Sequence, residues 1–158
     1  MNEKLLVGWR ETLSLPELGI EKIKAKIDTG ARTSCLHTFK VESFHKDAEL
    51  WVRFWIHPLQ RDNSQEVVCE AKVIDQRVVR DSGGHEETRY VIESTIRLGQ
   101  QSWKAELTLT NRENMAFRML LGRTAMHHRM LVDPVKSFLV PFEAVSYTHL
   151  RAHETRTY

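Results

Sequence analysis

The amino-acid sequence predicts an all-β protein that folds as a small barrel or sandwich. Short runs in which apolar residues alternate with polar ones, or in which β-branched residues gather, recur along most of the chain. Helical character is confined to residues 122–130, about two turns near the C-terminus. Many short strands with a single helix favour a closed sheet or two packed sheets.

The individual strands follow from these patterns. Residues 23–27 alternate Ile and Ala with Lys, which predicts a half-buried strand that ends at Asp28. Residues 49–56 alternate in the same way. The other expected strands are residues 66–74, 76–79, 90–98 and 102–110, with Gly99 in a hairpin between the last two, and two short strands within residues 130–140 around a turn at Asp133 and Pro134.

Length and composition predict one globular domain, over residues 1–144. The chain has 158 residues, 41% of them hydrophobic and 28% charged, which is enough to bury a core. Its 23 basic and 21 acidic residues nearly balance, so we expect no direct nucleic-acid binding. No apolar run approaches the roughly 18 residues of a membrane span, and the N-terminus does not resemble a signal peptide. Two cysteines that need not pair, Cys35 and Cys69, fit a cytoplasmic location.

The last fourteen residues, 145–158, break this pattern. They have no apolar periodicity, and polar, basic and His residues dominate after Leu150. We interpret them as a non-native or disordered tail. The segment resembles a peptide translated by read-through of adapter DNA, and the alternative is a natural disordered extension.

The stretch "KIDTGAR" contains the first candidate for chemistry. Gly30 permits a sharp turn, the Thr29 hydroxyl can reach a partner backbone, and Ala31 is small enough to pack in a crowded site. Aspartic proteases mount each of two aspartates in this way, and the pair shares one proton. We therefore expect Asp28, Thr29 and Gly30 to form a catalytic loop, with Ala31 and Arg32 beside the substrate. The alternative is a surface turn closed by a hydrogen bond to the Asp28 side chain.

A second motif, "LLGR", comprises Leu120, Leu121, Gly122 and Arg123. In retroviral-type aspartic proteases a segment of this kind crosses beneath the Asp-Thr-Gly loop and leads into a short helix. Because the chain holds a single Asp-Thr-Gly, a complete pair needs two chains, so we expect a homodimer with structural and dimer roles for this motif. The apolar terminal segments, residues 4–9 and 137–140, are expected to join the dimer contact.

Between the two motifs lies a Gly-rich hairpin. Its expected arms, residues 76–80 and 88–92, flank a tip that contains Ser82, Gly83 and Gly84. A flap that closes over a peptide needs mobile backbone and hydrogen-bond donors near the substrate. We expect the tip residues to bind substrate, and the alternative is an ordinary hairpin turn.

Taken together, the motifs resemble a known family. "KIDTGARTSCLH", "RYVIESTIRLGQQSWKAELTLTNRENMAFRMLLGR" and "MLVDPVKSFLV" are similar to the retropepsin-like proteins called RimK-associated "ATP-dependent zinc proteases", found beside the glutamate ligase RimK. This resemblance covers almost all of residues 5–140. It implies a small closed acid-protease barrel with one short C-terminal helix. It also implies endopeptidase activity on a peptide or protein, with a ribosomal protein that carries added glutamates as one candidate.

The residues themselves do not support the zinc and the ATP of that label. His85 in "HEETR" lacks the second His that a zinc-protease helix needs four residues later. Cys35 and His37 would share a face of a strand, but two further ligands are missing. No Gly-rich phosphate loop followed by Lys is present. We therefore expect no metal and no other cofactor.

Two other functions stay open. One is a non-catalytic peptide-binding or adaptor domain of the same fold that partners a glutamate ligase system, and the other is a metal-dependent protease. Arg32, Arg118 and Arg123 lie around the two motifs and could favour an acidic peptide. For Arg123 the resemblance favours an ion pair that helps hold the dimer, and for the other two the sequence does not decide.

Overall fold

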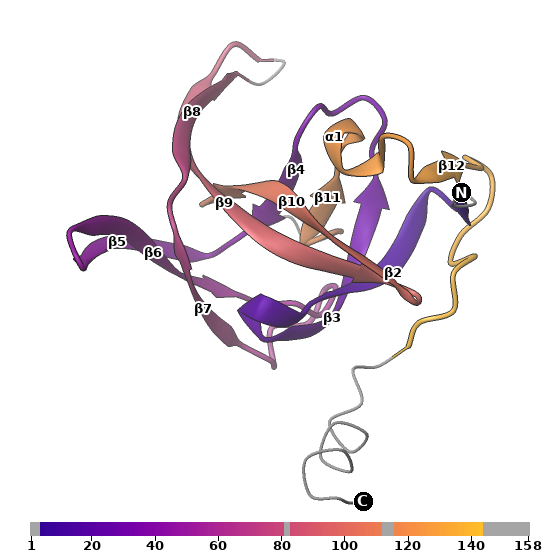
Figure 1. The fold of residues 1–158 in the computed structure, drawn as a ribbon, viewed down its shortest axis with the longest axis horizontal. Helices are drawn as coiled ribbons and strands as arrows, with labels where there is room; N and C mark the ends of the chain where they lie inside the picture. Colours follow the sequence, from indigo (N-terminus) through magenta and orange to yellow (C-terminus); the bar gives the residue numbers. More distant parts are fainter. Residues whose placement is uncertain (1–3, 81–82, 112–115, 144–158) are drawn as a thin grey trace, which may run out of the picture.

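A computed structural model describes residues 4–80, 83–111 and 116–143 and confirms an all-β fold (Figure 1). Ser82 and the expected tail, residues 145–158, lie outside the described residues. In chain order the elements are β1 Leu5–Val7, β2 Arg10–Leu15, a 3-10 turn Pro16–Leu18, β3 Ile20–Ile27, β4 Ser34–His37, β5 Lys40–Lys46, β6 Glu49–Ile56, β7 Val67–Lys72, β8 Asp75–Arg80, β9 Glu86–Leu98, β10 Gln101–Thr110, β11 Met119–Leu121, α1 Arg123–Met126 and β12 Met130–Val132.

The main sheet closes on itself. Its strands follow the order β10, β4, β11, β3, β2, β9 and β8, and β9 also pairs with β10. The strands from β10 to β9 therefore form a ring, and β8 is added to the outside of β9. The expected barrel is confirmed, and α1 is the one α-helix among the residues that the structure describes.

The barrel is filled by the apolar side of each alternating strand. In β3, Ile23 and Ala25 are buried while Lys22 is exposed. In β6, Val52, Phe54 and Ile56 are fully buried and extend the same core cluster. Burying one such side chain contributes roughly 1.5–3 kcal/mol, so the alternation that predicted these strands also supplies the driving force for their packing.

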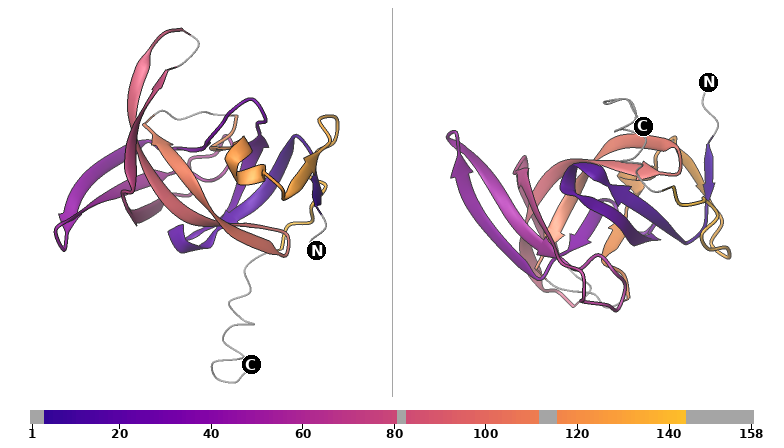
Figure 2. Two further views of the ribbon diagram at one scale, coloured as in Figure 1. Left: turned by 45° about the horizontal axis from the view of Figure 1, so that its top comes forward. Right: turned by 90° about the horizontal axis from the view of Figure 1, so that it is seen from below.

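A second sheet of three strands, β5, β6 and β7, extends to one side of the barrel (Figures 1 and 2). Its outer face carries Trp51, Arg53 and Trp55 of β6, all half-buried. Ion pairs and cation–π contacts cover this face, including Arg53 with Glu70 at 2.6 Å and Lys40 over the Trp55 ring at 4.5 Å. The face is therefore polar and internally paired.

Both cysteines are free, as the composition predicted, and both are buried. Burial raises the pKa of the Cys35 thiol, an effect that the nearby charge of Arg89 partly opposes. Burial alone raises the pKa of Cys69 to about 12. Both thiols are therefore neutral near physiological pH.

The C-terminal part of the described chain differs from the sequence prediction. The helix spans Arg123–Met126 rather than residues 122–130, because His127 leaves the helical conformation and His128 adopts a positive φ of 65°. One strand, β12, replaces the two expected within residues 130–140. After the turn at Asp133, the chain bonds to residues near the N-terminus without forming a strand.

A buried carboxylate binds the segment where the second strand was expected. Glu11 is fully buried in β2. Its carboxylate accepts hydrogen bonds from the backbone N–H groups of Gly8 at 2.7 Å, Leu139 at 2.8 Å and Val140 at 3.1 Å. The N–H groups of Leu139 and Val140 are thus satisfied by a side chain, while the Phe138 N–H donates to the Arg10 carbonyl at 3.0 Å. Glu11 ties both terminal segments to the barrel.

No helix among the described residues has the length and apolar character needed to cross a membrane.

Replacing Glu11 with Gln is expected to lower the free energy of unfolding by about 2 kcal/mol, because a charged acceptor of three backbone donors becomes a neutral amide. Urea denaturation followed by tryptophan fluorescence measures the loss. Glu21→Gln, in the exposed part of β3, is the matched control and is expected to change stability by less than about 0.5 kcal/mol. Equal effects of the two substitutions would contradict the role assigned to Glu11.

Candidate active site

The Asp-Thr-Gly loop follows directly from the end of β3. Asp28 is half-buried and its backbone N–H donates to the Leu121 carbonyl at 2.8 Å. Its Oδ1 accepts a hydrogen bond from the Gly30 N–H at 2.9 Å. This is the local bond of an Asx turn, which sequence reasoning offered as the alternative to a catalytic loop. Here the bond orients the carboxylate at the apex of the loop, while Thr29 and Gly30 are exposed.

The "LLGR" segment passes beneath this loop. Strand β11 lies between β3 and β4, parallel to the first and antiparallel to the second. After it, the Arg123 N–H donates to the Ala31 carbonyl at 2.8 Å and the Thr124 N–H to the Arg32 carbonyl at 3.0 Å. The loop is therefore held from below by successive backbone groups of one crossing segment.

Two further contacts fix the crossing. The Gly122 N–H donates to the Ser34 hydroxyl at 3.0 Å. A Cβ on Gly122 would lie 2.6–2.9 Å from backbone atoms of Thr33, which is too close for any other residue. The Arg123 guanidinium donates to the Thr29 carbonyl at 3.0 Å. Arg123 thus supports the loop from which Asp28 extends through a backbone carbonyl, and its ion pair in a dimer stays a prediction.

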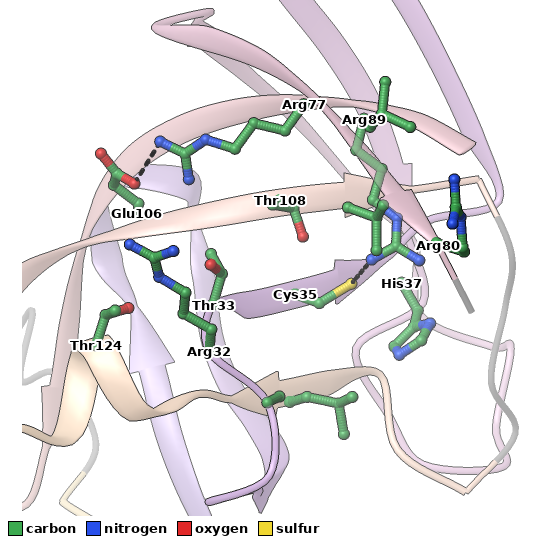
Figure 3. Close-up of a pocket in the computed structure, with 14 residues that line it drawn as sticks. Arg32, Thr33, Cys35, His37, Arg77, Arg80, Arg89, Glu106, Thr108 and Thr124 are labelled. Carbon is green, nitrogen blue, oxygen red and sulfur yellow. Dashed lines mark hydrogen bonds and ion pairs between the residues drawn. The ribbon is translucent and has the colours of Figure 1, made fainter. Parts of the chain in front are cut away.

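A cavity of about 700 Å³ opens between the loop and the flap hairpin (Figure 3). Its walls come from distant parts of the chain: Ala31, Arg32 and Thr33 of the loop, Cys35 and His37 of β4, residues 77–80 of β8, Arg89 of β9, Glu106 and Thr108 of β10, and Leu120 and Thr124 beside the loop. Asp28 lies three residues before Ala31, the first lining residue in the chain, but is not itself part of the cavity lining.

The cavity is strongly cationic. Arg32, Arg77, Arg80 and Arg89 line it, and the one acid among its described lining residues is Glu106. In Figure 3 the side chains of Arg32, Arg77 and Arg89 come from three different elements and lie around the same space. Such a concentration of guanidinium groups favours carboxylate or phosphate groups.

Each of two flap arginines has fixed partners. Arg77 contacts Glu106 through Nη2 and Asp75 through Nε, both at 2.9 Å. Both hydrogen bonds raise the pKa of Arg77, and the bond to Glu106 has the larger effect. Arg89 contacts Glu87 at 3.3 Å and donates to the Cys35 sulfur at 3.7 Å. Both guanidinium groups thus have acidic partners at the cavity wall.

The flap hairpin forms as the sequence predicted, with β8 and β9 as antiparallel arms. It extends away from the barrel in Figures 1 and 2. Gly83 and Gly84 lie at its tip and are exposed, and Gly84 adopts a positive φ of 85°. Neither glycine lines the cavity; the residues of the flap that do so belong to its arms.

Among the sequence candidates, the structure brings together the loop residues 28–32 and the crossing residues 120–123. It separates Arg118 from them, because Arg118 is only 1% exposed and bonds to the Asn63 side chain at 2.8 Å. Arg118 therefore makes a structural hydrogen bond and does not line the cavity. Of the three arginines considered for an acidic peptide, Arg32 is the one that lines the cavity.

Sequence reasoning missed the arginines of the flap arms, Arg77, Arg80 and Arg89. A signal was available in the pairing register, because Arg77 lies directly opposite Arg89 across the hairpin. That register depends on a tip whose length the sequence pattern did not define.

Cys35 and His37 line the same wall, as their spacing in a strand predicted. Within the described residues no group of three or more His, Cys, Asp or Glu side chains lies close enough together to hold a metal ion.

Known proteins resemble this chain over most of its length. A "Probable alpha-L-glutamate ligase" of Shewanella pealeana is 48% identical over 139 residues, which is 87% of this chain and 30% of the ligase. A protein of the same name from Parasynechococcus marenigrum is 52% identical over 134 residues, or 85% of this chain and 29% of that protein. The chain thus spans less than a third of the length of these curated relatives.

A solved structure shares the fold. The crystal structure of a Legionella pneumophila protein of unknown function superposes with a TM-score of 0.72 at 24% identity, covering 87% of this chain and 98% of that one. The family model of the retropepsin-like aspartic endopeptidase RimB matches residues 6–143. The match includes the Asp28 loop, the flap hairpin and the segment that crosses beneath the loop, and the chain belongs to this RimB-like family of retropepsin-like aspartic endopeptidases.

Proposed function

We propose that the chain is one half of a homodimeric aspartic endopeptidase in which Asp28 of two copies forms the catalytic pair. The observation that carries the proposal is the support of the Asp28 loop by the crossing segment, with Oδ1 oriented by the Gly30 N–H at 2.9 Å. A loop that is pinned from below and exposed at Thr29 and Gly30 is suited to meet an identical loop across a twofold axis.

The chemistry would follow from the closeness of the two carboxylates. Two charges about 3 Å apart cannot both ionise at low cost, so the pair holds one proton. The ionised Asp28 activates a water molecule, and the protonated Asp28 of the second copy polarises the peptide carbonyl. Closure of the β8–β9 hairpin would bring backbone donors near the peptide and exclude water.

Exposed apolar side chains on the terminal segments support a dimer. Leu6 and Leu131 are paired in the β1–β12 ribbon and are 53% and 55% exposed. Phe138 and Leu139 of the adjoining segment are 41% and 36% exposed. Exposed apolar side chains close together mark an interaction site, and we assign the Leu6–Leu131 pair and its adjoining segment to contact with a second copy of the chain.

The substrate is proposed to be an acidic peptide, such as the glutamate-bearing end of a ribosomal protein. Arg32, Arg77, Arg80 and Arg89 line the cavity, and guanidinium groups pair well with carboxylates. The similarity to proteins named as glutamate ligases supports a partnership with an enzyme that attaches glutamate. Two buried, unpaired thiols support a cytoplasmic location.

A second candidate is a peptide-binding or adaptor domain without turnover. It is favoured by one observation, that Asp28 does not line the cationic cavity. Such a domain would bind the acidic peptide for a ligase and would need no second Asp28. Cleavage by the parent protein distinguishes the two candidates.

Asp28→Asn is expected to reduce peptide cleavage at least about 10³-fold, because an amide can neither share the proton nor activate water. The measurement is turnover of a fluorogenic glutamate-rich peptide by the purified protein. Asp62→Asn is the matched control, since Asp62 also accepts a local backbone bond, from Ser64 at 2.8 Å, outside the site. Unchanged turnover in the Asp28 variant would exclude the aspartic mechanism.

Leu131→Lys is expected to raise the dimer dissociation constant at least about tenfold, because it places a charge in an apolar contact on both copies. Sedimentation velocity over a range of concentrations measures the effect. Val68→Lys, at a 51% exposed position of β7, is the control and should leave association unchanged. A parent protein that stays monomeric while cleaving peptide would refute the dimer.

A further inference from the structure

Two arginines face one another across the flap hairpin. The β8–β9 register places Arg77 directly opposite Arg89, and both side chains are half-buried while the neighbouring Val78 and Thr88 are exposed. Both arginines line the cavity. Like charges directly opposite one another destabilise a pair of strands, so this arrangement is costly unless anions accompany it.

One of the accompanying anions comes from β10, the strand that pairs with the other side of β9. Glu106 lies on β10, in the barrel, and its Oε1 contacts Nη2 of Arg77 at 2.9 Å. Asp75, on the same strand as Arg77, contacts Nε at 2.9 Å. Asp75 thus binds one edge of the guanidinium, and Nη2 points toward the Glu106 carboxylate beside it in the cavity lining (Figure 3).

The Arg77–Glu106 pair is readily exchanged. Its side chains are 38% and 43% exposed, and ion pairs with this much exposure contribute little to stability. A carboxylate from a bound peptide offers Nη2 the same chemistry as Glu106. Exchange would therefore replace one charge-assisted hydrogen bond with another of the same kind.

We propose that Arg77 is a specificity-determining residue that binds an acidic side chain of the peptide, and that Glu106 competes with that side chain for Arg77. The inference rests on the proposed function for its substrate class. Glu106 keeps the Arg77 side chain in the cavity lining when no peptide is bound. It also selects among peptides, because only a peptide that supplies a carboxylate can displace it from Arg77. Neutral peptides gain nothing from the exchange.

Binding to a non-cleaving background tests this directly. In Asp28→Asn protein, fluorescence anisotropy would measure the dissociation constants of hexaglutamate and hexaglutamine peptides carrying the same label. Adding Glu106→Gln is expected to tighten hexaglutamate binding about threefold, because the competitor is removed. Adding Arg77→Gln is expected to weaken it about tenfold. Hexaglutamine binding should not change with either substitution.

A double variant and a charge control separate competition from other effects. With Arg77→Gln present, Glu106→Gln should no longer tighten binding, since Glu106 acts through Arg77. Glu70→Gln removes an equal charge from the similarly exposed Arg53–Glu70 pair outside the cavity and should have no effect.

The proposal is overturned if hexaglutamate does not bind, if Glu106→Gln leaves its affinity unchanged or tightens both peptides equally, or if the gain persists without Arg77. An equal gain from Glu70→Gln would also overturn it. Because the readout is binding, absence of cleavage by the parent protein would refute the peptidase function and leave this test intact.

Discussion

The close crossing of Gly122 beneath Thr33 is the contact on which the rest of the site depends. There is no room for a Cβ, which would meet Thr33 backbone atoms at 2.6–2.9 Å. Because the two backbones approach so closely, strand β11 can sit between β3 and β4 and pair with both. The backbone bonds that carry the Asp28 loop follow from this insertion, and the loop needs no contact with the flap to keep its shape.

The same insertion closes the barrel and so creates the cavity. β11 joins the strands on either side of the loop, and β9 completes the ring by pairing with β10 while its outer half continues into the flap. The strands beneath the Asp28 loop and the projecting β8–β9 hairpin are therefore parts of one continuous sheet. The arginines of the flap arms line the same cavity as residues 31–33 of the loop.

The two ends of the described chain are held by a buried side chain instead of a close backbone crossing. Glu11 is an acid at a fully buried position, and three backbone N–H groups satisfy it. A buried carboxylate is tolerated only when it is hydrogen-bonded in this way. The result is a terminal ribbon that is fixed to the barrel yet leaves Leu6 and Leu131 exposed, which is the surface that a dimer would use.

The sequence by itself determined the all-β class, most of the longer strands, the flap hairpin and the motifs at Asp28 and Gly122. These features are local, because alternation, a turn glycine and a short motif are visible within a few neighbouring residues. It did not assign β2, β4, β5 and β11, in which apolar and polar residues do not alternate regularly along the whole strand. It also overestimated the helix, because the departure at His127 and the positive φ of His128 leave no trace in residue type.

Only the tertiary structure decided which side chains share a space. Arg118 lies two residues before the "LLGR" motif, yet its side chain is directed into the interior. Arg77 and Glu106 are 29 positions apart and meet at 2.9 Å. Strand register and barrel closure set these distances, and both depend on the packing of the whole sheet instead of on any short segment.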